Sequence, residues 1–152
     1  RTSVTENRLT GFYRACDELG LEIPEEYVRE GVYHDPDRCA ELTQELLKLE
    51  VPPTCILMPD DISSIGGGNA IRRMGFRLPG DVSAAGYDGI QLSSVMNPPL
   101  TTYRQDTQAL GKTAAAKLIE LIEKPRTALV DRILIPGRLV EGASVQAIEP
   151  QE

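Results

Sequence analysis

The sequence predicts an α/β fold in which a parallel sheet is flanked by helices. Segments with helical spacing of apolar residues alternate three times with short apolar runs, and the connections are too long for hairpins. The apolar runs are unbroken rather than alternating, so we expect both faces of each strand to be buried. A parallel sheet covered by helices meets that requirement.

The first half of the chain contains two predicted helices and two predicted strands. Residues 6–19 form a helix that Ser3 or Thr5 can cap and that Gly20 ends. Residues 28–33 form a short strand. Asp35 caps the next helix, Pro36 lies in its first turn, and the helix extends to about residue 49. Residues 54–58 form a continuous apolar strand.

The second half repeats the alternation. Residues 62–74 form a helix ended by Gly75, and residues 82–87 and 101–104 form strands. Residues 106–123 form the clearest amphipathic helix, since five apolar residues share one face: Leu110, Ala114, Leu118, Leu121 and Ile122. Two more strands cover residues 130–135 and 138–140, and the tail from Gln146 is polar.

Composition excludes several classes of protein. The 152 residues suit one globular domain, and no apolar run approaches the length of a membrane helix. The net charge of −7 and the scattered basic residues argue against binding of a nucleic-acid backbone by this segment. Three separated cysteines without CxxC spacing predict neither a zinc site nor a disulfide framework, which fits a reducing compartment. The chain opens at Arg1 rather than Met, so we expect a piece of a longer protein.

Polar side chains follow each predicted strand. Ligands of open parallel sheets bind beyond the carboxyl ends of the strands, so these groups are the candidate site. They include Tyr33 and His34, Asp60 and Asp61, Asp88, and Gln105, with Arg8 near the start of the first helix. Carboxylates accept hydrogen bonds from hydroxyl groups, Arg donates a planar fork, and an aromatic ring can stack on a sugar ring. The set suits a small polyhydroxylated ligand.

Each of these residues also has a structural interpretation. Asp60 or Asp61 can cap the helix that follows, and Asp88 before Gly89 can be a turn residue. Tyr33 can be a core aromatic, and His34 a surface residue. The glycines at positions 66–68 lack the Lys-Ser/Thr of a phosphate loop, so a close packing contact or a subunit interface explains them better. One histidine and no GxSxG motif leave no legible catalytic triad.

Several long segments resemble the effector-binding region of LacI/GalR-type bacterial transcription regulators. They are NRLTGFYRACDELGL, PTCILMPDDISSIGGGNAIRRMGFRLPGDVSAAGYDG, NPPLTTYRQDTQALGKTAAAKLIELI and LIPGRLVEGASV. The resemblance runs from about Arg8 to Val145. It implies a periplasmic-binding-protein-like (type I) fold, in which two α/β subdomains joined by three crossovers enclose a ligand cleft.

The resemblance also implies how the chain is divided. Residues 1–105 would be the C-terminal subdomain, and residues 106–137 a helix and strand of an otherwise missing N-terminal subdomain. Residues 138–145 would be the closing strand of the C-terminal subdomain, and residues 146–152 a polar tail. The helix 106–123 would then lack its usual sheet, so we expect it to be disordered, swapped or packed against another molecule.

The family's ligand contacts fall on six positions: Arg8, Tyr33, Asp60, Asp61, Asp88 and Gln105. Two departures leave the ligand open. The usual Ala-Asn-Asp is Pro59-Asp60-Asp61, and the usual second acid after GYD is Gly89. The positions ahead of RL-x-GF are not basic, which counts against a purine. The family's dimer interface falls on Cys39, Ile65 and Met96.

The resemblance implies a cytoplasmic effector-sensing domain of a homodimeric repressor. A small sugar or related metabolite would shift the dimer's affinity for operator DNA, which only a domain absent from this chain would contact. We expect no enzyme activity, no cofactor or metal, and no membrane contact. The rival interpretation is an extracytoplasmic sugar receptor of a transport system, which shares the architecture.

Overall fold

The computed structural model describes residues 2–127 and 132–147. They divide into two compact units, Arg1–Glu30 and Gly31–Glu152. The first unit contains helix α1 (Ser3–Leu19) and a short 3-10 turn (Glu25–Tyr27). Thr2 caps α1 by accepting a hydrogen bond from the Thr5 amide at 3.3 Å, and Gly20 ends it in the left-handed conformation. The predicted end at Gly20 is therefore confirmed, whereas the cap is Thr2 rather than Ser3 or Thr5.

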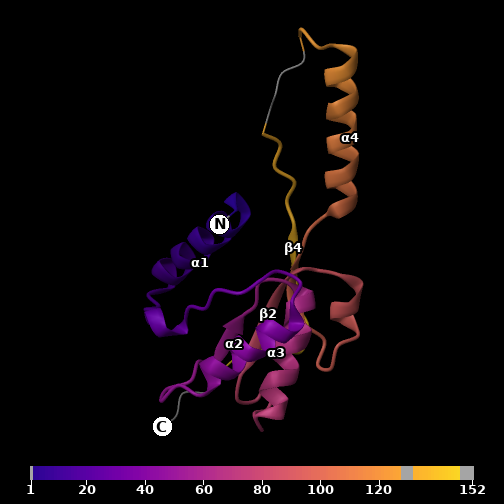
Figure 1. Ribbon diagram of the computed structural model, residues 1–152. Helices are drawn as coiled ribbons and strands as arrows, with labels where there is room; N and C mark the ends of the chain where they lie inside the picture. Colours follow the sequence, from indigo (N-terminus) through magenta and orange to yellow (C-terminus); the bar gives the residue numbers. More distant parts are fainter. Residues whose placement is uncertain (1, 128–131, 148–152) are drawn as a thin grey trace. The chain divides into compact units, whose positions relative to one another are not determined.

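The second unit is built on a four-stranded sheet in the order β1-β2-β3-β4 (Figure 1). Strands β1 (Cys55–Leu57), β2 (Ser83–Asp88) and β3 (Thr101–Arg104) are parallel, and β4 (Arg138–Val140) runs antiparallel to β3. The α/β class with a mostly parallel sheet is confirmed. Strands β1 to β4 fall within one residue of four of the predicted strands.

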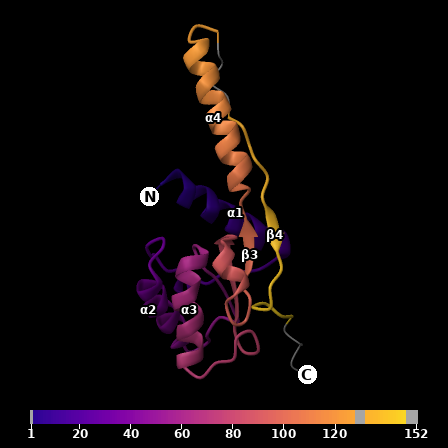
Figure 2. The ribbon, with the colours of Figure 1, turned by 90° about the vertical axis from the view of Figure 1, so that its right-hand side faces the viewer.

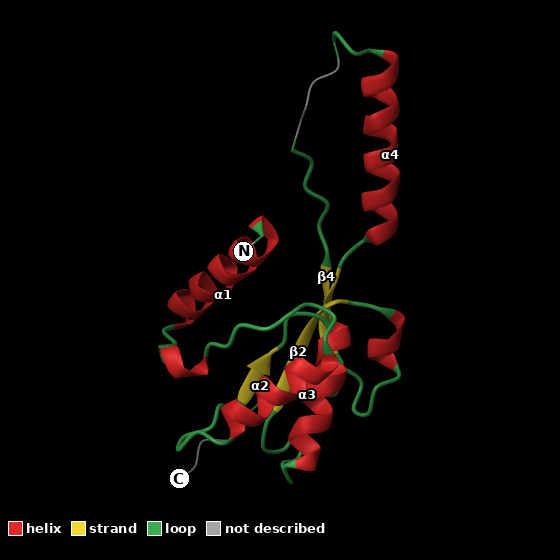
Figure 3. Ribbon diagram, viewed as in Figure 1, coloured by secondary structure: helices red, strands yellow, loops and turns green. Residues whose placement is uncertain are grey.

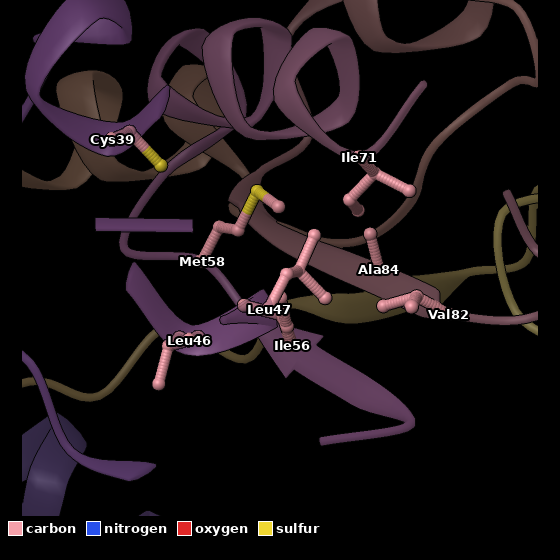
Figure 4. Packing of buried hydrophobic residues seen from close by; sticks show 8 residues of the cluster. All are labelled: Cys39, Leu46, Leu47, Ile56, Met58, Ile71, Val82 and Ala84. Atoms are coloured by element: carbon pink, nitrogen blue, oxygen red, sulfur yellow. The ribbon is translucent and has the colours of Figure 1, made fainter. Parts of the chain in front are cut away.

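Helices α2 (Pro36–Leu47) and α3 (Asp61–Arg73) lie side by side against this sheet (Figure 2). Asp35 caps α2 by accepting from the Arg38 amide at 2.9 Å, as expected, with Pro36 in the first turn. Figure 4 shows the core that the two helices form with β1 and β2. Its members are buried apolar side chains: Cys39, Leu46, Leu47, Ile56, Met58, Ile71, Val82 and Ala84.

The three consecutive glycines explain how α2 and α3 approach so closely. A Cβ atom at Gly66 would overlap the carbonyl oxygen of Pro36, and one at Gly67 would overlap the Met58 side chain. Of the two explanations that the sequence left open, the structure supports a packing contact inside the chain. Gly66 and Gly67 are needed for packing inside the chain, so they are not evidence for a subunit interface at this position.

Helix α4 (Thr107–Glu123) forms at the predicted position but buries none of its residues. Leu118, Ile119 and Ile122 are each more than half exposed. Figure 3 shows α4 beside the irregular segment that leads into β4, and Ile133 and Ile135 of that segment line a shallow cavity with Leu110. Helix α4 is formed and capped by Asp106, which disagrees with the first of the three expectations, disorder. Swapping or packing against another molecule stays a prediction.

Two predicted strands are absent from the described residues. Residues 28–33 form no strand, and neither do residues 132–135, while positions 130 and 131 lie outside the described residues. Burial on both faces is also wrong for β1. Ile56 faces the core, whereas Leu57 is 57% exposed. An apolar run therefore predicted the strand correctly without predicting a cover for each face.

Candidate ligand-binding site

The carboxyl ends of β2 and β3 bring two of the predicted ligand contacts together. Because the strands are parallel, Asp88 at the end of β2 and Gln105 just after β3 meet at one edge of the sheet. The Gln105 side-chain amide donates to Asp88 Oδ1 at 2.7 Å, and the Gln105 backbone amide donates to the Asp88 carbonyl at 3.2 Å. An acceptor and an amide that both donates and accepts thus lie side by side.

His34 adds a third polar group to this edge. Its Nε2 lies 3.9 Å from Asp88 Oδ2, and its side chain is 61% exposed while that of Asp88 is 22% exposed. The His34 backbone amide donates to Asp60 Oδ2 at 2.9 Å, which ties the loop before α2 to the start of α3. The sequence left His34 open between a candidate site residue and a surface residue, and the fold brings it to Asp88.

The backbone is unusual at the same two residues. His34 has φ of 59° and Asp88 has φ of 108°, and they are the non-glycine residues with positive φ in the described part of the chain. Side chains disfavour this region, and such residues persist where the surrounding structure holds them, often at binding sites. Their pairing across the candidate site supports a functional use of this edge.

Asp60 is a buried helix cap. It is 0% exposed, and its carboxylate accepts from the Ser63 amide and hydroxyl, both at 2.8 Å, besides the His34 amide. Burial alone would raise the pKa of Asp60, but the hydrogen bonds from His34 and Ser63 outweigh it and hold the pKa below its ordinary value. The structural interpretation of Asp60 as a cap is confirmed, and direct ligand contact stays a prediction.

Asp61 is equally buried and joins three elements. It is 0% exposed, accepts from the Thr102 hydroxyl at 2.6 Å, and accepts from the Ile90 amide at 2.9 Å. Burial raises the pKa of Asp61 above its ordinary value, although these hydrogen bonds lower it. Asp61 therefore positions the turn after Asp88 and holds it against β3. Its direct contact with a ligand also stays a prediction.

For two of the predicted ligand contacts, Tyr33 and Arg8, the structure shows which segment of the chain carries them. Tyr33 is half-buried in the loop before α2, next to His34. Arg8 lies on α1 in the first unit, and its role stays a prediction. Sequence reasoning missed Thr102 and Ser63, whose hydroxyls bind the two buried carboxylates. The LTT motif and the serine three residues after Asp60 are the signals that could have identified them.

The three predicted interface residues separate in the structure. Ile65 and Met96 line one shallow cavity of about 390 Å³ together with Asn69, Arg72 and Asn97. Cys39, in contrast, is 9% exposed and belongs to the core. Its placement on a subunit surface is wrong, because the α2 face that carries it packs on α3 and β1. Desolvation accordingly raises the pKa of the Cys39 thiol.

Residues 2–127 and 132–147 contain neither a membrane-spanning helix nor a cluster of metal ligands. No helix among them is both long and apolar enough to cross a membrane. No group of three or more potential metal ligands gathers among them either.

Comparison with known families and proteins agrees with this architecture. The model of the periplasmic binding protein-like domain matches residues 1–145. The chain is 36% identical over 148 residues to the HTH-type transcriptional repressor PurR of Mannheimia succiniciproducens, covering 97% of this chain and 44% of PurR.

Two solved structures share the fold closely. The Lac repressor dimer bound to operator and the anti-inducer ONPF is 30% identical with a TM-score of 0.82, covering 92% of this chain and 47% of that one. The complex of the transcriptional regulator CelR with cellobiose is 27% identical with a TM-score of 0.83, covering 90% and 41%. This chain spans less than half the length of all three proteins.

Proposed function

Because this chain belongs to the periplasmic binding protein-like domain family, in its LacI/GalR-type branch, we propose that it senses the effector of a transcriptional repressor. The observation that carries the proposal is the meeting of Asp88, Gln105 and His34 at the carboxyl ends of the parallel strands. These groups offer an acceptor, an amide and an imidazole within reach of one small molecule. The chain supplies one wall of a cleft, and a second subdomain supplies the other.

The proposed ligand is a small polyhydroxylated metabolite, with a sugar as the leading class. A carboxylate and an amide together accept from and donate to neighbouring hydroxyl groups, as ring hydroxyls require. The CelR relative, whose solved structure is a complex with cellobiose, supports this class. Binding would favour one cleft geometry and so shift the equilibrium between states that differ in affinity for operator DNA. No step of this scheme uses a cofactor or catalytic turnover.

We place dimerisation on the surface around Ile65 and Met96. Leu92 and Val95, close to Met96 in the chain, are 47% and 72% exposed, so apolar surface extends beyond the cavity. Covering such surface in a homodimer removes it from water. Met96→Glu would place a charge there, and we expect it to make the intact protein monomeric in sedimentation measurements. A dimer that persists at equal concentration would contradict this placement.

The decisive experiment uses the intact protein encoded by the gene that contains this sequence. DNA fragments that it retains from its own genome would be sequenced, and a panel of sugars screened for release of that DNA. We expect a releasing sugar to lose its effect on Asp88→Ala and to weaken on Gln105→Ala, while DNA affinity without sugar stays unchanged. The matched control Asp37→Asn, on the exposed first turn of α2, should respond normally.

Two outcomes would overturn the proposal. If the sugar released DNA from Asp88→Ala as it does from the wild type, the proposed binding site would be wrong. If the intact protein retained no DNA, the proposed repressor role would be wrong. Cytoplasmic location follows from the repressor role and is checked by fractionation of cells. A sugar-binding protein recovered outside the cytoplasm, without DNA affinity, would support the transport receptor instead.

A further inference from the structure

A row of three charged side chains crosses the end of the sheet beside Gln105. Asp88 of β2 is the register partner of Arg104 of β3, and Arg104 is the register partner of Arg138 of β4. Register partners on neighbouring strands lie on the same face of a sheet, about 5 Å apart. One carboxylate and two guanidinium side chains therefore leave adjacent positions at the edge where the candidate site lies.

The turn after β2 holds Arg104 in place. The Arg104 Nε donates to the Gly89 carbonyl at 3.0 Å, and a side chain at residue 89 would overlap Arg104 itself. This contact uses one of the five guanidinium N–H donors and leaves the terminal nitrogens. Among the described residues, no carboxylate lies within 4.0 Å of the guanidinium of Arg104 or Arg138. The Gly89 carbonyl thus helps to orient the Arg104 guanidinium and leaves its positive charge uncompensated.

Two arginines directly opposite each other on antiparallel strands are unfavourable, because like charges at such positions repel. The chain as a whole carries a net charge of −7, so the local excess of positive charge is not a general property of its surface. The planar guanidinium fork matches the oxygens of phosphate and carboxylate groups, and two forks can hold one such group from both sides. An oxyanion bound between them would relieve the repulsion.

We propose that Arg104 and Arg138 form an oxyanion subsite, so that the effector is a polyol carrying a phosphate or carboxylate group. The inference deepens the proposed function and rests on it. Asp88 and Gln105 receive the hydroxyl groups, while the arginine pair receives the anionic group. Three neighbouring strands place these positions across about 10 Å, which suits a phosphorylated sugar or a sugar acid.

The first test needs no knowledge of the natural effector. Thermal unfolding of the intact protein is followed while chloride is replaced by inorganic phosphate at constant ionic strength. We expect phosphate to raise Tm in a saturable way, with about ten-fold weaker binding in Arg104→Gln and in Arg138→Gln and none in the double variant. Arg73→Gln removes an exposed arginine at the far end of α3 and should bind phosphate like the wild type. No saturable effect on the wild type, or an equal effect on the double variant, would overturn the subsite.

The second test distinguishes the anionic group and separates the two proposals. DNA release is compared for glucose, glucose 6-phosphate and gluconate, with the wild type and the double variant. Release by either anion that the double variant loses supports the subsite and identifies phosphate or carboxylate as its partner. Neutral sugars that release DNA equally from both proteins would overturn the subsite and leave the repressor function standing. If the effector still released DNA from the Asp88→Ala variant as it does from the wild type, the proposed function itself would be overturned.

A third measurement reports on the pair without any ligand. Because the two guanidinium groups repel, Arg138→Gln should raise Tm slightly at low salt in the absence of oxyanions, and added sodium chloride should remove the difference. A lower Tm for Arg138→Gln under these conditions would show that the arginine stabilises the fold, and would contradict the subsite.

Discussion

Helices α3 and α4 show that the strength of a sequence pattern and the burial of a helix are separate properties. Helix α4 has the clearest apolar stripe in the sequence, yet none of its residues is buried. Helix α3 contains three consecutive glycines, each unfavourable in a helix, yet eight of its residues are buried. The difference lies in what each helix packs against. Within the described residues of the second unit, α3 packs against α2 and the sheet, whereas α4 lies against the irregular segment that contains Ile133 and Ile135.

Most of the stability of a helix in a protein comes from packing rather than propensity. For α3, the lack of side chains at Gly66 and Gly67 is what permits close packing, so weak propensity and deep burial have one cause. For α4, the exposed apolar stripe fits the hypothesis that residues 106–137 belong to a second subdomain. Five predictions break or sharpen this comparison, in decreasing order of expected effect.

The largest effect is expected for Gly66→Ala. The new methyl group would overlap the Pro36 carbonyl oxygen, a backbone atom that cannot move without shifting α2. We expect a loss of more than about 3 kcal/mol of unfolding free energy, measured by urea denaturation, or no folded protein at all. Stability within about 0.5 kcal/mol of the wild type would show that α2 and α3 are not in close contact.

A pair of isoleucines tests burial directly. Ile71 of α3 is 0% exposed, and Ile122 of α4 is 69% exposed. We expect Ile71→Ala to cost about 2–5 kcal/mol and Ile122→Ala less than about 0.5 kcal/mol in urea denaturation of this 152-residue chain. In the intact protein, a larger loss for Ile122→Ala would indicate that another segment covers α4. Equal losses in the chain alone would contradict the exposed position of Ile122.

Removal of the N-terminal cap should also cost more stability for α3 than for α4. Asp60 of α3 accepts three hydrogen bonds in a buried position, whereas exposed Asp106 of α4 accepts one from the Ala109 amide at 2.8 Å. We expect Asp60→Ala to cost about 2–3 kcal/mol and Asp106→Ala about 1 kcal/mol. Similar losses for the two variants would contradict a special role for the buried cap.

The cap of α3 also predicts a pH dependence. Because the folded-state pKa of Asp60 lies below its ordinary value of 3.8, its contribution to stability is complete above that value. The contribution is lost as pH falls through the folded-state pKa. Urea titrations between pH 6 and pH 2 should therefore show a smaller acid loss for Asp60→Asn than for the wild type. Parallel curves would contradict the lowered pKa.

The smallest effect is expected for Gly111→Ala in α4, and its sign is opposite. A Cβ atom at Gly111 meets no other atom within 4 Å, so the substitution gains helix propensity without a clash. We expect a stabilisation of about 0.5–1 kcal/mol by urea denaturation or an equivalent rise in helicity. A loss of stability would show that α4 is covered at this position even in this chain.

The candidate site was predicted only in part. Asp88 and Gln105 follow strands that the sequence identifies, and parallel strands necessarily end at one edge, so their meeting could be anticipated. His34 was also listed as a candidate, but the strand before it does not form, and its approach to Asp88 depends on a left-handed backbone and on the amide contact with Asp60. Asp60 and Asp61 were predicted as ligand contacts from their position after a strand and from the family resemblance, and in the structure both join separate elements.

The sequence by itself determined the order and type of most elements, the caps at Asp35 and Gly20, and the parallel sheet. These follow from local preferences and from spacing of apolar residues, which act over a few positions of the chain. Tertiary structure alone decided which helix and strand faces are buried. It also decided that Cys39 lies in the core rather than on the surface, and that Gly66 packs against Pro36 of α2. Those outcomes depend on which distant segments meet, and an apolar residue is equally apolar whether or not a partner arrives to cover it.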